Sequence, residues 1–154
     1  MKPIALALAL CSIVTTAQLA HSQVAGAPAN KVTPQTPECL KYQPESVQLI
    51  GHLENLTFPG GPSFTSLSQG DTPETGYYLR LAHRVCTIAD KDKDAKADVA
   101  LLQLVADSAD LATLRPLVDK EIIVHGTLLP ATNGHHHTPV ILMPALPVTL
   151  YRAP

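Results

Sequence analysis

Three consecutive histidines, His135-His136-His137, are the densest group of chemically active side chains in the sequence. Side chains alternate between the two faces of an extended segment, so His135 and His137 can point together while His136 points the other way. Two imidazoles on one side can bind Zn²⁺ or Cu²⁺ when further ligands converge on them. His52 and His125 are candidates for those ligands, because each stands beside a glycine in segments that are expected to pair as antiparallel strands.

Two other interpretations of this His-rich turn, residues 135–137, remain open. The histidine spacing matches no standard zinc signature, and imidazoles at a turn can instead shape it and hydrogen-bond the loop backbone. The third interpretation is that the histidines contact a ligand or a partner. We therefore expect no cofactor, with Zn or Cu as the alternative.

A long segment at residues 59–75 is the other candidate for function. It contains Pro-Gly-Gly-Pro-Ser-Phe at residues 59–64 and Gly-Asp-Thr-Pro-Glu at residues 70–74. Loops longer than about 12–15 residues are usually functional or disordered. Alternatively, its prolines and glycines only fix its path, and Phe64 fills the core. Glu74 could form an acid–base pair with the His-rich turn, although nothing in the sequence favours this.

Recognised catalytic motifs are missing from the sequence. There is no Gly-x-Ser-x-Gly, no phosphate-binding glycine loop and no His-Glu-x-x-His. A serine, a histidine and an aspartate could still meet in space, so a hydrolase of the cell envelope is the least favoured alternative. A formal net charge of -2 leaves no basic footprint for nucleic acid. The sequence therefore favours a protein that is not an enzyme and does not bind nucleic acid.

The N-terminus has the pattern of a cleavable secretory signal peptide. Lys2 precedes an apolar run at residues 4–14, and small residues follow, with cleavage expected after Ala17, Ala20 or Ser22. The run is too short to span a bilayer, which needs about 20 residues. The alternative interpretation is a buried N-terminal helix.

This pattern divides the chain into three parts. We predict a signal peptide at residues 1–22, a flexible leader at residues 23–38 and one domain at residues 39–154. The leader is rich in Ala, Pro and Thr and shows no periodicity. The mature protein is therefore expected to be periplasmic or secreted and to have no membrane span.

The cysteines predict a disulfide bond. Removal of the signal peptide would remove Cys11 and leave Cys39 and Cys86. An even pair in an exported protein indicates one disulfide, with two free buried thiols as the alternative. Closing a loop of about 47 residues stabilises a fold by up to roughly 4 kcal/mol.

The elements that must position these residues are mainly strands. Alternating apolar and polar residues predict five of them. They cover residues 47–58, 76–88, 98–106, 120–129 and 138–151. A short helix, with Ser108 as its candidate N-cap, is expected between the third and fourth strands. This order is that of the OB-fold, so the predicted fold class is mainly β, a small five-stranded OB-like barrel. Another small antiparallel barrel or a β-sandwich is the alternative.

Glycines and prolines refine this prediction. Gly51, in the middle of the first strand, suggests a bend or bulge, as at a barrel corner. Asn133-Gly134 is a strong hairpin signal between the last two strands. Pro144 and Pro147 imply an edge, a bulge or a strand end within the fifth strand.

In OB-folds, the loop between strands 1 and 2 and the loop between strands 4 and 5 flank one binding face. The predicted fold would therefore bring residues 59–75 and the His-rich turn together, beside the sheet. The candidate ligand-binding residues are Phe58, Gly60, Gly61, Phe64, Glu74, Tyr78, Arg80, His135, His136 and His137. The favoured function is a non-enzymatic exported binding module for an unknown protein, peptide or small ligand of the cell envelope. An immunity or inhibitor role against an exported toxin fits the small size.

Several segments carry a resemblance to a known family. They are residues 39–40, 47–53, 57–60, 70–75, 124–128 and 134–140, the last reading Gly-His-His-His-Thr-Pro-Val. The sequence resembles a family of uncharacterised bacterial exported domains, a domain of unknown function. This resemblance implies an envelope or periplasmic location in a Gram-negative bacterium. It implies no established activity and no catalytic residues.

Overall fold

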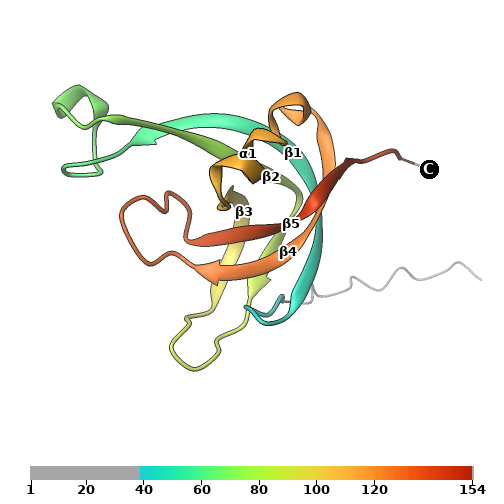
Figure 1. The fold of residues 1–154 in the computed structure, drawn as a ribbon. Coiled ribbons are helices and arrows are strands. Elements are labelled where there is room, and N and C mark those ends of the chain that lie inside the picture. The colour runs from blue at the N-terminus through green and yellow to red at the C-terminus, as the bar shows by residue number, and fades with distance from the viewer. Residues whose placement is uncertain (1–38, 154) are drawn as a thin grey trace, which may run out of the picture. The chain divides into compact units, whose positions relative to one another are not determined.

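The computed structural model describes residues 39–153. The predicted signal peptide, residues 1–22, and the predicted leader, residues 23–38, lie outside the described residues. The strands are β1 (Ser46–Pro59), β2 (Pro73–Thr87), β3 (Lys96–Leu104), β4 (Glu121–Pro130) and β5 (Val140–Leu150) (Figure 1). The helical elements are η1 (Leu67–Gln69), α1 (Ser108–Ala112) and η2 (Arg115–Leu117), of which η1 and η2 are 3-10 turns.

The five strands close into a barrel in the order β1-β2-β3-β5-β4. All neighbouring strands are antiparallel except β3 and β5, which run parallel. That parallel contact is short and joins Gln103 and Leu104 to Ile141 and Leu142. The mainly β fold predicted from the sequence is confirmed, including the short helix between the third and fourth strands.

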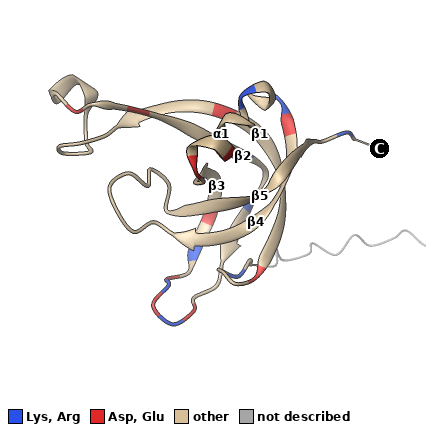
Figure 2. Ribbon diagram, in the orientation of Figure 1, with Lys and Arg blue, Asp and Glu red and all other residues tan. Residues whose placement is uncertain are grey.

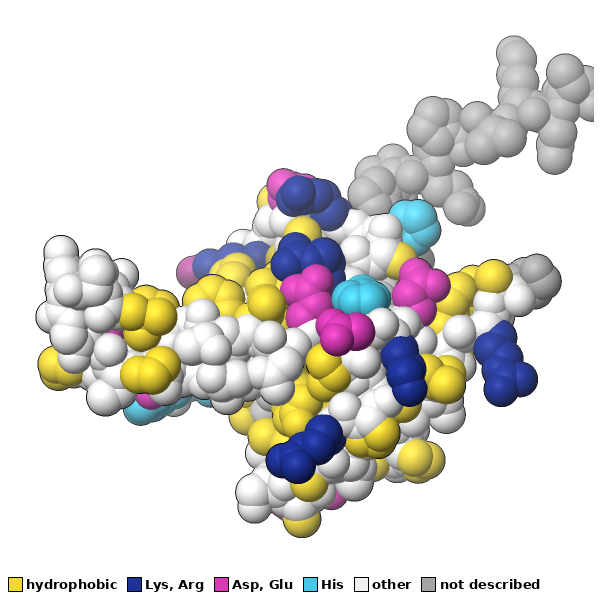
Figure 3. Space-filling view, turned by 90° about the horizontal axis from the view of Figure 1, so that it is seen from above, with side chains coloured by type: hydrophobic (Ala, Val, Ile, Leu, Met, Phe, Trp, Pro, Cys, Tyr) yellow, Lys and Arg dark blue, Asp and Glu magenta, His cyan; other side chains and the backbone are white. Residues whose placement is uncertain are grey.

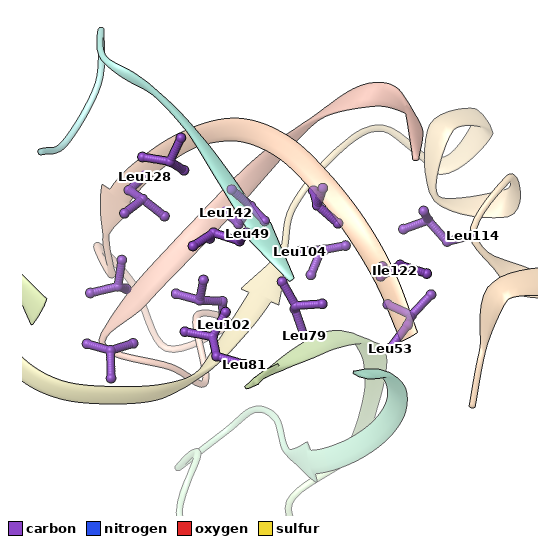
Figure 4. Close-up of a cluster of buried hydrophobic side chains, with 14 of the residues drawn as sticks. Leu49, Leu53, Leu79, Leu81, Leu102, Leu104, Leu114, Ile122, Leu128 and Leu142 are labelled. Atoms are coloured by element: carbon purple, nitrogen blue, oxygen red, sulfur yellow. The ribbon is translucent and has the colours of Figure 1, made fainter. Parts of the chain in front are cut away.

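The interior of the barrel is filled by aliphatic side chains from all five strands. Along β1, Val47, Leu49 and Leu53 are buried at alternate positions, as a strand with one inward face requires. Figure 4 shows such inward side chains gathered in one cluster. Leu114, which follows α1 and is 1% exposed, adds a side chain from outside the sheet at the edge of this cluster (Figure 4).

Two glycines allow neighbouring strands to approach closely. A Cβ atom on Gly51 would lie 2.3 Å from the Arg80 carbonyl oxygen of β2. A Cβ atom on Gly126 would lie 2.3 Å from the Met143 carbonyl oxygen of β5. Backbone atoms cannot retreat as a flexible side chain can, so these positions require glycine.

The β1–β2 hairpin is longer than the sequence predicts. β2 begins at Pro73 rather than at residue 76, and the ladder reaches the pair Pro59 and Pro73. Proline contributes no N–H group, so this pair marks a natural end of the ladder. Glu74 therefore belongs to a strand, opposite Phe58, and not to the loop.

The helix begins at Ser108, so Ser108 is not the N-cap predicted from the sequence. The N-cap is Asp107, whose side chain accepts a hydrogen bond of 2.9 Å from the N–H group of Asp110. Aspartate and serine cap helices about equally well, so the sequence pattern could not separate two adjacent candidates.

Pro144 and Pro147 both lie inside β5. β3 contacts β5 only at Ile141 and Leu142, so both prolines stand where β5 has a neighbour on one side alone. Proline is tolerated at such edges. The register between β4 and β5 also shifts between the pairs on either side of Pro147, which is the irregularity that the prolines predict.

The disulfide predicted from the cysteine count joins Cys39 to Cys86. Beside it, the Leu40 N–H group donates to the Cys86 carbonyl oxygen at 2.8 Å, and the Ile88 N–H group donates to the Leu40 carbonyl oxygen at 3.0 Å. The segment before β1 is thus fixed to β2 by a covalent bond and by hydrogen bonds. Disulfides are typical of proteins in oxidising compartments. Among the described residues, no helix has the length and apolar character needed to cross a membrane.

Candidate functional site

Two loops that are distant in sequence meet at one end of the barrel. They are the β1–β2 loop, residues 60–72, and the β4–β5 loop, residues 131–139 (Figure 1). The ring of Phe64 meets the imidazole of His135 edge-on, with 5.0 Å between ring centroids. A Cβ atom on Gly134 would lie 2.8 Å from the Phe64 ring. The predicted meeting of the long loop and the His-rich turn is therefore confirmed.

Asp71 organises the β1–β2 loop. Its carboxylate accepts hydrogen bonds from the N–H groups of Ser63, Thr65 and Ser66 at 2.7, 2.7 and 2.9 Å. The bond from Ser66 lowers the pKa of Asp71 most, and the bonds together outweigh burial, which raises it. The backbone of Phe64 has a φ of 59°, a left-handed conformation that residues other than glycine rarely adopt. The hydrogen bonds to Asp71 on both sides hold Phe64 in that conformation.

Glu74 joins the hairpin to the His-rich turn. Its Oε1 atom lies 2.7 Å from Nδ1 of His135, and its Oε2 atom lies 3.0 Å from Nε2 of His137. Burial raises the pKa of Glu74, but the hydrogen bonds with His137 and His135 outweigh it, and the pKa lies below its ordinary value. Glu74 is therefore ionised at neutral pH, and both imidazoles turn a donor towards it.

Gly60 makes room for the Glu74 side chain. A Cβ atom at this position would lie 2.4 Å from Oε1 of Glu74 and 2.5 Å from its Cδ atom. Any larger residue would push the carboxylate away from the histidines. Gly60 thus supports the site without offering a functional group of its own.

Gln103 of β3 fixes the backbone of the His-rich turn. Its Nε2 atom donates to the His135 carbonyl oxygen at 3.0 Å, and its Oε1 atom accepts from the His137 N–H group at 2.7 Å. The Gln103 N–H group donates to Oγ1 of Thr138 at 3.0 Å. The turn is therefore anchored to a strand of the barrel as well as to Glu74.

An aromatic stack lies behind the histidines. Phe58 lies parallel to the imidazole of His137, with 5.1 Å between centroids and 9° between planes. The ring of Phe58 also packs against that of Tyr78, with 5.0 Å between the ring centroids. Tyr78 is completely buried, and its hydroxyl group makes no hydrogen bond to any described residue. Burial, assisted by the charge of Glu74, raises the pKa of Tyr78 to about 12.

These groups enclose a pocket of about 260 Å³. Its walls come from β2, from β3 and from the His-rich turn. The lining residues are Glu74, Thr75, Gly76, Tyr78, Gln103, His135 and His137. Four predicted site residues therefore line one pocket, and Phe58, Gly60 and Phe64 stand behind them in supporting contacts.

The remaining predicted site residues lie outside the pocket. His136 turns back on its own loop, where its Nδ1 atom accepts from the Thr132 N–H group at 3.0 Å. Arg80 forms two hydrogen bonds with the Glu54 carboxylate, at 2.6 and 2.8 Å. The Gly61 carbonyl oxygen accepts a hydrogen bond from the Thr72 N–H group of the same loop, and Gly61 is not among the residues that line the pocket.

The predicted pairing of His52 with His125 is wrong. β1 and β4 are antiparallel neighbours as expected, but His52 faces Glu121, and His125 faces Gln48. The two histidines are therefore four positions apart, about 13 Å along the strands. Within residues 39–153 no group of three or more His, Cys, Asp or Glu side chains could hold a metal ion.

Sequence reasoning missed Thr75 and Gly76, which line the pocket, and Asp71 and Gln103, which hold the two loops in place. Gln103 interrupts an otherwise apolar strand, which is the signal that a polar side chain there has a partner. Asp71 follows a glycine in a loop rich in Ser and Thr, a typical place for side chain to backbone hydrogen bonds.

One protein family matches part of the chain. Residues 101–143 match the family described as Domain of unknown function (DUF4431). This match begins within β3, includes Gln103 and the His-rich turn, and ends within β5. No curated protein and no solved structure matches the chain.

Proposed function

We propose that this protein is a non-enzymatic binding module of the cell envelope. Its ligand site is the pocket between the β1–β2 hairpin and the His-rich turn. The observation that carries this proposal is the double contact of Glu74 with His135 and His137. This contact makes one concave site from two segments that lie about 60 residues apart in sequence.

The pocket has the features of a preformed site. Ligand sites are concave, largely built before binding, and equipped with a few converging polar groups. Here Asp71 holds the loop, and Gln103 holds the His-rich turn, so the pocket needs little ordering when a ligand enters. A site ordered in advance loses less entropy on binding.

The chemistry of the pocket favours binding over catalysis. The hydroxyl of Thr75 lies 2.7 Å from that of Thr57, so its hydrogen bond goes to another hydroxyl and not to a base. Tyr78, with its pKa raised to about 12, stays protonated at neutral pH. A hydroxyl nucleophile needs an adjacent base or a lowered pKa, and neither residue has one among the described residues.

The location outside the cytoplasm is part of the same proposal. It is supported by the disulfide between Cys39 and Cys86, because cytosolic reductants keep most thiols reduced. The predicted signal peptide at residues 1–22 supports export to the periplasm or beyond. Mass spectrometry of protein recovered from the envelope fraction tests the location and the removal of the signal peptide. The mature N-terminus should fall within residues 18–23.

The binding site is tested by nuclear magnetic resonance with isotope-labelled protein and a chemically diverse set of small molecules and short peptides. Molecules that bind should shift the amide signals of Gly76, Gln103 and His137. His137→Ala should weaken their binding, whereas His125→Ala, an exposed histidine on β4, should leave it unchanged. Binders that shift only signals elsewhere, or that bind His137→Ala as tightly as the unchanged protein, would show that this pocket is not the site.

A further inference from the structure

The hydroxyl group of Tyr78 makes no hydrogen bond to any described residue. The side chain is completely buried, and it lines the pocket. No fully enclosed polar side-chain atom among the described residues lacks a hydrogen bond, so this hydroxyl is not fully enclosed, and Tyr78 is one of the residues that line the pocket. The hydroxyl is therefore available for a hydrogen bond with a polar group of a ligand in the pocket.

The charge of the pocket selects among such ligands. Glu74 is the only Asp, Glu, Lys or Arg residue in its lining. Residues 55–79 and 121–151, which form the hairpin and the strands around the His-rich turn, contain neither Lys nor Arg. Figure 2 shows no Lys or Arg on the projecting β1–β2 hairpin or on the β4–β5 loop. On the face seen in Figure 3, the Lys and Arg side chains lie over the barrel. The Glu74 carboxylate would repel an anionic ligand, and no Lys or Arg in the lining would offset that repulsion. The same carboxylate attracts a cation.

Glu74 keeps the capacity to bind such a cation. A carboxylate offers about four lone-pair sites, and the two histidines occupy one on each oxygen atom. Glu74 and Tyr78 both line the pocket, so a donor that enters it comes close to both residues.

The size of the pocket sets the size of the group. Sites for drug-sized molecules usually measure about 300–1,000 Å³. This pocket, at about 260 Å³, is smaller and takes the end of a side chain or a short amine.

We propose that the pocket binds a primary ammonium or guanidinium group through Glu74 and Tyr78. The group comes from a Lys or Arg side chain of a partner or from a free polyamine, which share this chemistry. This inference rests on the proposed function, because it names the ligand class of the same pocket.

The test titrates the isotope-labelled protein with four probes and follows the amide signals of Gly76 and Gln103. Nα-acetyl-lysine methylamide carries one ammonium group, and Nα-acetyl-norleucine methylamide is its uncharged counterpart. Putrescine represents free polyamines, and methyl glucoside represents neutral polyols. We expect the lysine probe to bind at least about tenfold more tightly than the norleucine probe, a difference of about 1.4 kcal/mol.

Three variants locate the contact. Glu74→Gln keeps the shape of the side chain but removes its charge, and it should weaken binding of the lysine probe at least about tenfold. Tyr78→Phe removes only the hydroxyl group and should weaken binding by a smaller factor. Tyr77→Phe, the matched change one residue earlier on β2, should leave binding unchanged.

Equal binding of the lysine and norleucine probes to the unchanged protein would overturn the inference, whatever the variants do to the loop. Binding of methyl glucoside alone, with shifts at Gly76 and Gln103, would reject the cation and leave the proposed binding site intact. Shifts confined to other surfaces would reject the cation site as well. Tighter binding of the lysine probe than of putrescine supports a partner side chain, and the reverse supports a free polyamine.

Discussion

The ring of Phe64 lies between two glycines, and this arrangement makes the contact between the two loops testable. A Cβ atom on Gly134 would lie 2.8 Å from the ring, whereas a Cβ atom on Gly61 would lie 3.8 Å from it. Neither glycine has a positive φ, so alanine fits the backbone at both positions. Gly134→Ala therefore introduces a clash, and Gly61→Ala introduces an ordinary contact with the same ring.

The expected effects follow from these distances. Carbon atoms in contact are about 3.5–4.0 Å apart, so the methyl group introduced by Gly134→Ala would push the ring away by roughly 1 Å. Overpacking of this kind lowers the free energy of unfolding by about 1–3 kcal/mol. Replacing glycine also restricts the unfolded chain, which offsets about 0.4–1 kcal/mol. The net loss for Gly134→Ala is therefore about 0–2.6 kcal/mol, centred near about 1.3 kcal/mol, while Gly61→Ala should be neutral or stabilising by up to about 1 kcal/mol.

Urea unfolding measures both variants, with a shift of the midpoint at constant slope reporting the change in stability. The proton signals of the His135 ring provide a second readout, because the edge-on contact with Phe64 changes when the ring moves. Gly134→Ala should change those signals and lower the midpoint. Equal midpoints for the two variants, with unchanged His135 signals, would refute the loop contact.

Two further predictions concern the disulfide and the pH dependence of stability. Replacing Cys39 and Cys86 together by alanine should lower the free energy of unfolding by up to about 4 kcal/mol, because the disulfide closes a loop with a sequence separation of 47. Urea unfolding measures this loss of stability, and a loss below about 1 kcal/mol would contradict the prediction. The folded pKa of Glu74 lies below its ordinary value of 4.5, so its contribution to stability is fully present above that pH and is lost as the pH falls through the lowered pKa. Glu74→Gln should therefore lose less stability than the unchanged protein as the pH falls below 4.5, and parallel curves would contradict this.

The strands could be predicted because period-2 alternation is directly visible in the sequence. β1 was expected at residues 47–58 and runs over Ser46–Pro59, since Val47, Leu49 and Leu53 alternate with polar residues. The start of β2 could not be predicted in the same way. Proline and glutamate are poor strand formers, and the ladder extends to Pro73 because each residue there has a partner on β1.

The Asn133-Gly134 pair shows how a local signal can point to the right region although the backbone there differs from the one that the signal is typical of. The hairpin predicted between the last two strands is present, with a loop at residues 131–139, but neither residue has the positive φ angle that is common for Asn-Gly in short hairpins. The glycine is needed because the Phe64 ring approaches it closely. A contact with a residue 70 positions earlier leaves no trace in the local sequence pattern.

The site was predictable in its location but not in its groups. Barrel topology alone places the two loops on one rim, which brought Phe64, Glu74 and the His-rich turn together in advance. Alternation along the second predicted strand puts Tyr78 and Leu79 on opposite faces, and with Leu79 facing the core it gives no reason to expect that Tyr78 is buried. Tyr78 is buried there with the ring of Phe58 packed against it, a tertiary effect that the strand pattern does not contain.

The side chains that hold the site in place come mainly from strands of the barrel. The contact between Glu74 and His135 is exposed, and exposed ion pairs contribute little to stability on their own. The contact persists because Gln103, on β3, hydrogen-bonds the backbone of both His135 and His137. It is also supported by Phe58, on β1, which stacks on the imidazole of His137. Sites built on strands are positioned more precisely than sites built on loops. For the ligand proposed above, Glu74 and the Tyr78 hydroxyl, both on β2, would therefore determine the selectivity of the pocket.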